Sequence, residues 1–132
     1  MIMTGLLDRV CEHEGFESKP YQDHLGNWTF GHGLTWISEE ESKAIVDERL
    51  AKNATALIGE HPWIKDHSRE IFEVLVEMSY QMGVAGCLGF KKMWLALEER
   101  DYVGAATEGM DSKWAKQTPN RARGLMQVFL DS

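Results

Sequence analysis

The stretch CEHEGFESKPYQDHLGNWTFGHGLT, residues 11–35, changes from a helical pattern to a strand-and-turn pattern within a few positions. Three apolar residues shortly before it have helical spacing: Leu6, Leu7 and Val10. They predict a first helix over residues 2–14, which Gly15 is expected to end because glycine adopts the left-handed conformation at low cost. Strand-favouring residues on both sides of the turn sequence HLGN then predict a small β-hairpin or meander over residues 16–36.

The residues that follow are typical of helices. Residues 38–41, SEEE, form a capping box that predicts a helix running to Gly59, and Pro62 is expected to break the chain after it. A further helix is expected to begin at Asp66 and to end at Gly83. Its apolar stripe consists of Ile71, Val74, Leu75 and Met78.

The last third of the chain predicts shorter helices. Residues 83–90, GVAGCLGF, are rich in glycine and are expected to form a bend. Short helices are expected at about 90–100 and 101–109. Thr118 followed by Pro119 predicts an N-cap with proline at the first helical position, and thus a final helix. The apolar side of that helix holds Ala122, Leu125, Met126 and Phe129.

These patterns predict an α+β fold that is mainly helical. The 132 residues, 43% of them hydrophobic, fit a single domain spanning 1–132. The β-rich hairpin at 16–36 is expected to form one lobe. The helical bundle at about 60–132, joined by the helix at 2–14, is expected to form the other, with a cleft between the two.

Composition excludes several classes of function. Fourteen basic residues against 21 acidic ones give a formal charge of −7, which argues against a nucleic-acid partner. No run approaches the roughly 18 apolar residues of a membrane span, and the N-terminus lacks the pattern of a signal peptide, so no membrane insertion is expected. Cys11 and Cys87 are too few for a disulfide framework and are expected to be buried thiols.

Two acids of the opening stretch have contrasting predicted environments. Glu14 lies at the end of a predicted helix, where the negative end of the macrodipole favours the protonated form of a carboxyl group. Asp23 lies on a polar turn, where it should stay ionised. A proton-donating acid together with an ionised carboxylate is the pattern of glycoside hydrolysis. Taken alone, each residue is better explained as an ordinary acid, because acids near helix ends are common.

Three blocks of sequence resemble the phage-type lysozymes (glycoside hydrolase family 24). The first is the pattern EG, YxD and GxxTxGxG over residues 14–33, the second is YQMG at 80–83, and the third is WAKQTPNRAR at 114–123. They occur in the family's order and span most of the chain. The resemblance implies a lysozyme-like fold and a muramidase that cuts the β-1,4 bond between N-acetylmuramic acid and N-acetylglucosamine in peptidoglycan.

The resemblance also assigns catalytic roles. Glu14 takes the place of the general acid, Asp23 that of the second carboxylate, and Thr29 that of the hydroxyl that holds the attacking water. A carboxylate and a hydroxyl on two strands can hold one water between them, so we predict an inverting mechanism. The reaction is expected to need no cofactor.

Further residues are assigned supporting roles. Tyr80 and Gln81 match a substrate-binding segment, and Arg121 matches an arginine near the catalytic acid. His32 lies between two glycines, where the family often has an aliphatic or aromatic residue. Leu34 stands where the family has a histidine, so the polar contact of that histidine is missing or rebuilt here. The N-terminal lobe and C-terminal tail are shorter than in T-even members, which predicts a more open cleft.

Aromatic residues and histidines are the remaining candidates for binding sites. Trp28, on the predicted hairpin, is the best candidate for stacking on a sugar, whereas Trp94 and Trp114 are expected in the core. The five histidines form no HExxH motif, so no metal site is expected. They are His13, His24, His32, His61 and His67.

The expected partner is bacterial peptidoglycan, attacked by a monomer that waits in the host cytoplasm and reaches the wall through a separate release system. One alternative is a catalytically silent module that binds the cell wall or belongs to a virion. Another is a lytic transglycosylase, which needs a single acid and releases a 1,6-anhydro product. The presence of Glu14, Asp23 and Thr29 together favours the hydrolase.

Overall fold

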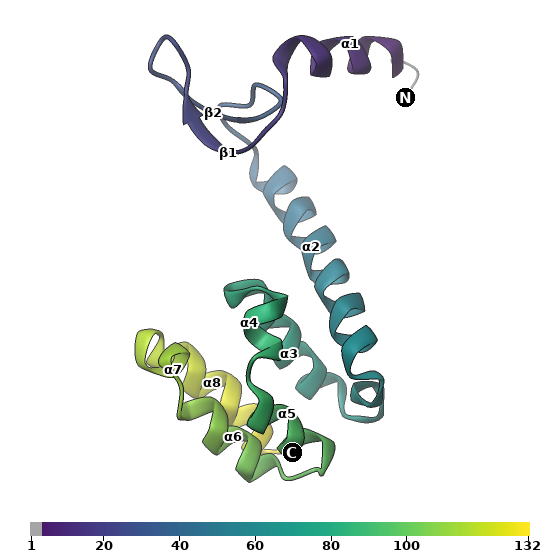
Figure 1. Ribbon diagram of the computed structural model, residues 1–132, viewed down its shortest axis with the longest axis vertical. Helices are drawn as coiled ribbons and strands as arrows, with labels where there is room; N and C mark the ends of the chain where they lie inside the picture. The colour runs from purple at the N-terminus through teal and green to yellow at the C-terminus, as the bar shows by residue number, and fades with distance from the viewer. Residues whose placement is uncertain (1–3) are drawn as a thin grey trace. The chain divides into compact units, whose positions relative to one another are not determined.

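The computed structural model describes residues 4–132, so residues 2 and 3 of the first predicted helix lie outside the described part. The chain divides into two compact units, residues 1–44 and residues 45–132, and the boundary falls within one long helix. The architecture is mainly helical with one small antiparallel sheet, as predicted (Figure 1).

The first unit begins with helix α1 (Thr4–Glu14), which ends as predicted. Gly15 has a φ of 69°, and its N–H donates a hydrogen bond of 2.9 Å to the carbonyl of Cys11. This is the left-handed C-terminal cap that glycine forms most readily. It turns the chain directly after Glu14 into the first strand.

The predicted hairpin is confirmed. Strand β1 (Glu17–Gln22) pairs antiparallel with β2 (Trp28–Gly31), with Tyr21 opposite Thr29. The register is irregular between Glu17 and Tyr21. Thr29 is only 5% exposed, whereas every residue of β1 is exposed. The sheet therefore holds one hydroxyl in a sheltered position.

Helix α2 (Glu39–Glu60) begins at the predicted capping box. The Ser38 N–H donates to Oε1 of Glu41 at 3.0 Å, and the Glu41 N–H donates to Oγ of Ser38 at 3.1 Å. These reciprocal bonds satisfy two donors at the helix N-terminus. The chain then breaks before Pro62, as expected, and continues as the short 3-10 helix η1 (Pro62–Asp66).

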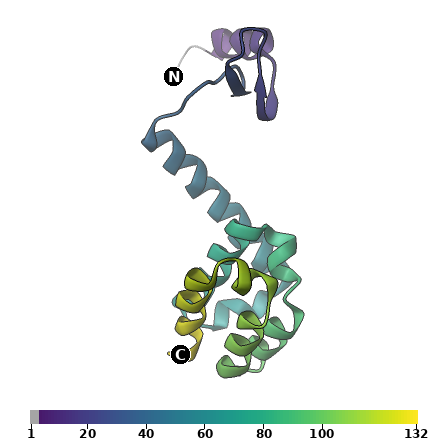
Figure 2. The ribbon, with the colours of Figure 1, turned by 90° about the vertical axis from the view of Figure 1, so that its left-hand side faces the viewer.

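The second unit is built around helix α3 (Arg69–Met82). Helices α5 (Lys91–Glu98), α6 (Tyr102–Met110) and α8 (Pro119–Leu130) complete most of it, and α6 packs against both α5 and α8 (Figure 2). Helices were predicted at all four of these places. The most deeply buried large side chains are Leu57, Ile64, Ile71, Leu75, Met78, Met93, Leu97, Met126 and Phe129.

Two predictions in this unit were wrong in detail. The helix expected from Asp66 starts later, because Ser68 is its N-cap and accepts a hydrogen bond from the N–H of Ile71 at 3.3 Å. The bend expected from the glycine-rich residues 83–90 contains helix α4 (Val84–Leu88). A Cβ on Gly86 would lie 3.2 Å from Cγ of Met82, so the missing side chain permits close packing that outweighs glycine's low helix propensity.

A further short helix, α7 (Lys113–Gln117), precedes α8 and was not predicted. Its N-cap Ser112 accepts a hydrogen bond from the N–H of Ala115 at 3.2 Å. Pro119 occupies the first turn of α8 as predicted, but the Thr118 side chain makes no capping bond there. No helix in the described residues 4–132 has both the length and the apolar character needed to cross a membrane.

The two thiols differ in environment, and both are free. Cys87 is fully buried in the second unit, and burial raises its pKa to about 12. Cys11 in α1 is only partly buried. The prediction of a buried thiol is therefore confirmed for Cys87 and wrong for Cys11, because the residues of α1 are largely exposed within the first unit.

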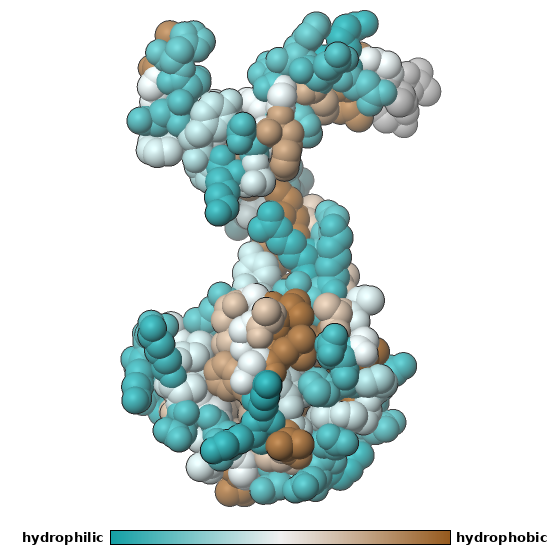
Figure 3. Space-filling model, in the orientation of Figure 1, coloured by the Kyte–Doolittle hydropathy of each residue, from teal (hydrophilic) through white to brown (hydrophobic). Residues whose placement is uncertain are grey.

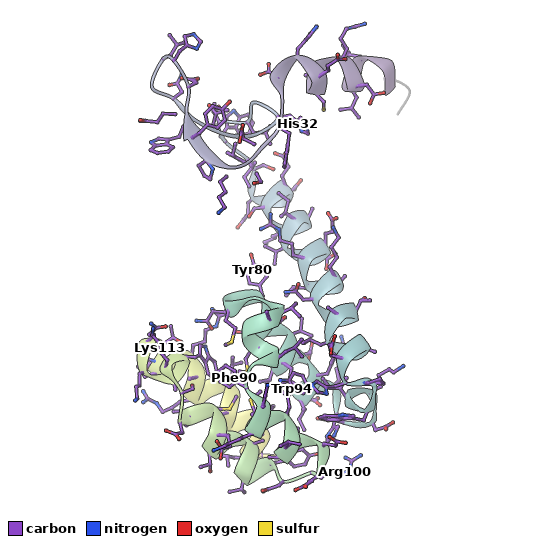
Figure 4. All side chains as sticks on the ribbon, in the orientation of Figure 1. His32, Tyr80, Phe90, Trp94, Arg100 and Lys113 are labelled. Carbon is purple, nitrogen blue, oxygen red and sulfur yellow. The ribbon has the colours of Figure 1, made fainter. Side chains whose placement is uncertain are left out.

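Aromatic and imidazole rings connect η1 to α5 and α6. His61 stacks on Trp94 with ring centroids 4.3 Å apart, and Trp63 meets the Trp94 ring edge-on at 6.1 Å. Nδ1 of His67 lies 2.9 Å from the hydroxyl of Tyr102. Trp94, labelled in Figure 4, is 2% exposed and so lies in the core, as predicted.

This cluster makes the stability of the second unit depend on pH. Burial lowers the pKa of His67, and the nearby Arg100 lowers it further, against the opposing charge of Asp66. A histidine with a lowered pKa in the folded state binds its proton more readily when unfolded. The contribution of His67 to the free energy of unfolding is therefore present above the pKa of the unfolded histidine, about 6.5, and is lost as the pH falls below that pKa.

We expect the melting temperature of the native chain to be lower at pH 5.5 than at pH 7.5, and this decrease to be smaller in His67→Gln. The two pH values lie about one unit on either side of the pKa of a free imidazole. Thermal unfolding followed by far-ultraviolet circular dichroism measures this. His24→Gln, on the exposed hairpin turn, is the matched control and should retain the full pH effect. An identical pH dependence in the native chain and His67→Gln would exclude His67 as the origin.

Candidate active site

Glu14 is the last residue of α1 and is exposed. Its carboxyl group packs on the backbone of Gly33, in the loop that follows β2. A Cβ built on Gly33 would lie 2.8 Å from Cδ and 3.2 Å from Cγ of Glu14. Any larger residue at position 33 would therefore displace the Glu14 side chain, and the φ of 74° at Gly33 also favours glycine.

Asp23 is held at the hairpin turn by two backbone donors. Its Oδ1 accepts hydrogen bonds of 2.9 Å from the N–H groups of Asn27 and Leu25. The bond from Asn27 lowers the pKa of Asp23 most, partial desolvation opposes it, and the bond from Leu25 lowers it further. The carboxylate therefore stays ionised near neutral pH and has a fixed orientation.

Thr29 is connected to Asp23 through one backbone carbonyl. The carbonyl oxygen of Asn27 accepts hydrogen bonds from the Thr29 hydroxyl at 3.3 Å and from the Asp23 N–H at 2.9 Å. Since a hydroxyl has one hydrogen and two lone pairs, Thr29 can still accept a hydrogen bond from water. The shared carbonyl therefore joins the backbone of Asp23 to the side chain of Thr29 across the hairpin.

Two other predicted residues of the first unit lie on its surface. Trp28 is 62% exposed, which leaves its ring free to stack on a ligand. His32, labelled in Figure 4, is at the tip of the loop after β2 and lies against the ring of Phe16.

In the second unit, Gln81 joins α3 to the segment that starts α8. Its Oε1 accepts a hydrogen bond of 2.8 Å from Nε1 of Trp114, and its Nε2 donates one of 3.3 Å to the hydroxyl of Thr118. The Thr118 hydroxyl donates in turn to the carbonyl of Trp114 at 3.1 Å. Tyr80, the other predicted substrate-binding residue here, is 40% exposed. The network fixes the orientation of the Gln81 amide.

Gln81 also lines a pocket of about 770 Å³. Its apolar lining includes Met82, Phe90, Met93 and Trp114. Three lysines and two acids contribute charge: Lys91, Lys92, Lys113, Glu108 and Asp111. Figure 4 shows Phe90 just before α5 and Lys113 at the start of α7, and Figure 3 shows hydrophobic surface on this unit within a mainly hydrophilic exterior. An apolar pocket with a few polar groups has the character of a ligand site.

Arg121 forms an ion pair that the sequence did not predict. Its Nε donates to Oε2 of Glu77 at 2.9 Å, between α8 and α3. Both side chains are nearly half exposed, at 41% and 46%, so solvent screens the pair.

Within residues 4–132, no group of three or more histidine, cysteine, aspartate or glutamate side chains is arranged to hold a metal ion.

The sequence matches the model of the family described as phage lysozyme over residues 11–127. The chain belongs to the phage lysozyme family. Among curated phage-lysozyme relatives, "Probable T4-type lysozyme 1" of Dictyostelium discoideum is 31% identical over 97 residues, 70% of this chain and 56% of that protein. "Probable T4-type lysozyme 2" of the same organism is 38% identical over 55 residues, 42% of this chain and 32% of that protein.

An "Endolysin" of Acyrthosiphon pisum secondary endosymbiont phage 1 is also similar to this phage lysozyme family member. The two are 26% identical over 121 residues, 86% of this chain and 80% of that protein. The chain spans about half or less of the length of the two Dictyostelium relatives.

Sequence reasoning missed several contacts in this member of the phage lysozyme family. The spacing of two glycines around His32 was a signal for a tight loop, but not for the packing of Gly33 on Glu14. Trp114 is buried, as predicted for a core residue, and it also lines the pocket and donates to Gln81. Phe90 and Lys113 gave no signal, because no motif distinguishes pocket residues from other residues of short helices.

Proposed function

We propose that this chain is a peptidoglycan muramidase that hydrolyses the β-1,4 bond between N-acetylmuramic acid and N-acetylglucosamine. Membership of the phage lysozyme family supports the substrate class. The observation that carries the chemistry is the environment of Asp23 and Thr29, which share one backbone carbonyl at the turn of the hairpin. An exposed acid, Glu14, ends the helix of the same unit.

In this proposal, Glu14 donates a proton to the leaving glycosidic oxygen. Asp23 is ionised before the reaction, because two N–H groups hold its Oδ1, and its other oxygen takes the proton that the attacking water loses as the new C–O bond forms. The Thr29 hydroxyl accepts a second bond from the same water. Water attack on the face opposite the leaving group inverts the anomeric centre, and no cofactor is required.

We further propose that Tyr80, Gln81 and Trp28 contact the substrate. The Gln81 amide is fixed by Trp114 and Thr118, which limits the entropy it loses on binding. The exposed ring of Trp28 suits a sugar face, and the lining of the pocket beside Gln81 combines apolar surface with lysines. Three expectations stay predictions: that the protein acts as a monomer, that it waits in the host cytoplasm and that it uses a separate release system.

Digestion of purified peptidoglycan tests the proposal. Mass spectrometry of the products should find muropeptides that end in a reducing N-acetylmuramic acid, released by the native chain and not by Glu14→Gln. Products lighter by one water would instead indicate a lytic transglycosylase. Binding to the wall without any soluble product would indicate a catalytically silent module.

Arg121 offers a separate test, because its ion pair can be removed from either side. The pair with Glu77 is exposed, so Arg121→Ala and Glu77→Gln should each change the free energy of unfolding by at most about 1 kcal/mol. If Arg121 orients the catalytic acid, as the family resemblance implies, Arg121→Ala should lose activity and Glu77→Gln should not. Equal activities in the two variants would leave Arg121 with the role of a surface ion pair.

A further inference from the structure

The loop after β2 has a narrowly defined shape. The N–H of Phe30 donates to the carbonyl of Leu34 at 2.8 Å, and the N–H of Leu34 donates back to the carbonyl of Phe30 at 2.8 Å. Between them, Gly31 and Gly33 have positive φ values of 58° and 74°, a conformation that other residues rarely adopt. His32 is therefore displayed at the tip of a closed three-residue loop.

One side of this loop rests on the carboxyl group of Glu14, through the close approach of Gly33. Within the first unit, over residues 4–44, no hydrogen-bond donor or cation pairs with that carboxyl group. The position of Gly33 therefore bears directly on the direction in which Glu14 points.

The tip of the loop makes a second contact with the same segment of chain. The rings of His32 and Phe16 have centroids 5.1 Å apart and an interplanar angle of 46°. Such tilted ring pairs are attractive. Phe16 follows Gly15 and lies two residues from Glu14, so the ring pair fastens the loop to the chain that carries the acid.

We propose that His32 is a positioning residue for Glu14, and this rests on the proposed function of Glu14. Its tilted ring contact with Phe16 holds Gly33 against the carboxyl group, and so keeps the proton donor aimed at the glycosidic oxygen. The ring face of the imidazole is the required feature. A phenyl ring at position 32 should therefore hold the loop in place, and a methyl group should not.

Kinetics on soluble glycan strands that carry stem peptides test this with four variants: His32→Ala, His32→Phe, Phe16→Ala and the double alanine variant. We expect His32→Ala to lower kcat about 2- to 10-fold with little change in KM, the rate equivalent of one aromatic pair. His32→Phe should retain the native kcat. Because the two alanine substitutions break the same ring contact, the double variant should lose no more kcat than either single variant.

A structural readout accompanies the kinetics. The amide resonance of Gly33 in a ¹H–¹⁵N spectrum should shift in His32→Ala and in Phe16→Ala, and should remain near its native position in His32→Phe. Phe16 is 62% exposed, so its removal should leave the fold intact, which circular dichroism checks.

Three results would overturn the proposal: a native kcat in His32→Ala, an effect on KM alone, or equal losses in His32→Ala and His32→Phe. The last would mean that the imidazole nitrogens matter and the ring face does not. Failure of the proposed function is distinguishable, because the native chain itself would then release no muropeptide. The Gly33 resonance would still report whether His32 holds the loop.

Discussion

Replacing Glu14 with glutamine is expected to lower the muramidase rate by about 100- to 10,000-fold, the usual contribution of general acid catalysis. An amide has the size of a carboxyl group but cannot donate the proton that the leaving oxygen needs. The Glu14 side chain is exposed and packs on Gly33, so the substitution should preserve this contact. The loss should appear in kcat, since binding of the substrate does not depend on the proton.

The measurement is the initial rate of reducing-end release from peptidoglycan, with circular dichroism as the check on folding. Glu12→Gln is the matched control, because Glu12 is another exposed glutamate of α1 and makes the same change of charge. It should retain the native rate. A Glu14→Gln variant with more than about a tenth of the native rate would contradict the assignment of the acid.

The elements that the sequence predicted best are those fixed by neighbouring residues. The cap at Gly15 needs only a carbonyl four residues earlier, and the capping box joins Ser38 to Glu41 within one turn. The hairpin follows from strand-favouring residues around a short turn. In each case the residues that make the contact are close together in the sequence, so the local sequence pattern is enough to predict the element.

Elements that depend on distant residues were missed. Helix α4 buries Cys87, whose thiol lies 3.6 Å from the carbonyl of Leu75, 12 residues earlier in the chain. Glu77 and Arg121 are 44 residues apart in sequence. Neither contact leaves a local pattern, because helix propensity and charge spacing describe only the near neighbours of a residue.

In the candidate site, too, the local features were predicted and the contacts between segments were not. Resemblance to a family supplied the identities of Glu14, Asp23 and Thr29, and the chain's own pattern placed Asp23 on a polar turn. The sequence did not predict that Asp23 and Thr29 bind the same carbonyl, nor that Gly33 packs on Glu14. Both contacts depend on the exact register of the hairpin, which the irregularity between Glu17 and Tyr21 makes hard to foresee.

The shared carbonyl of Asn27 leads to a prediction of stereochemistry. Two N–H groups hold Oδ1 of Asp23 and leave its other oxygen to act on a water, and the sheltered Thr29 hydroxyl retains lone pairs for the same water. This arrangement suits an attacking water better than a covalent glycosyl-enzyme intermediate. An aspartate that attacked the sugar directly would have no use for the threonine.

We therefore expect inversion, with the newly formed reducing end released as the α-anomer. Proton NMR of the products in the first minutes, before mutarotation, distinguishes the anomers. Thr29→Val keeps the shape of the side chain and should lower the rate about tenfold, the equivalent of one hydrogen bond lost in the transition state. Thr29→Ser retains the hydroxyl and should remain active. A predominantly β product at early times would require a retaining mechanism, in which Asp23 is the nucleophile and Thr29 holds no attacking water.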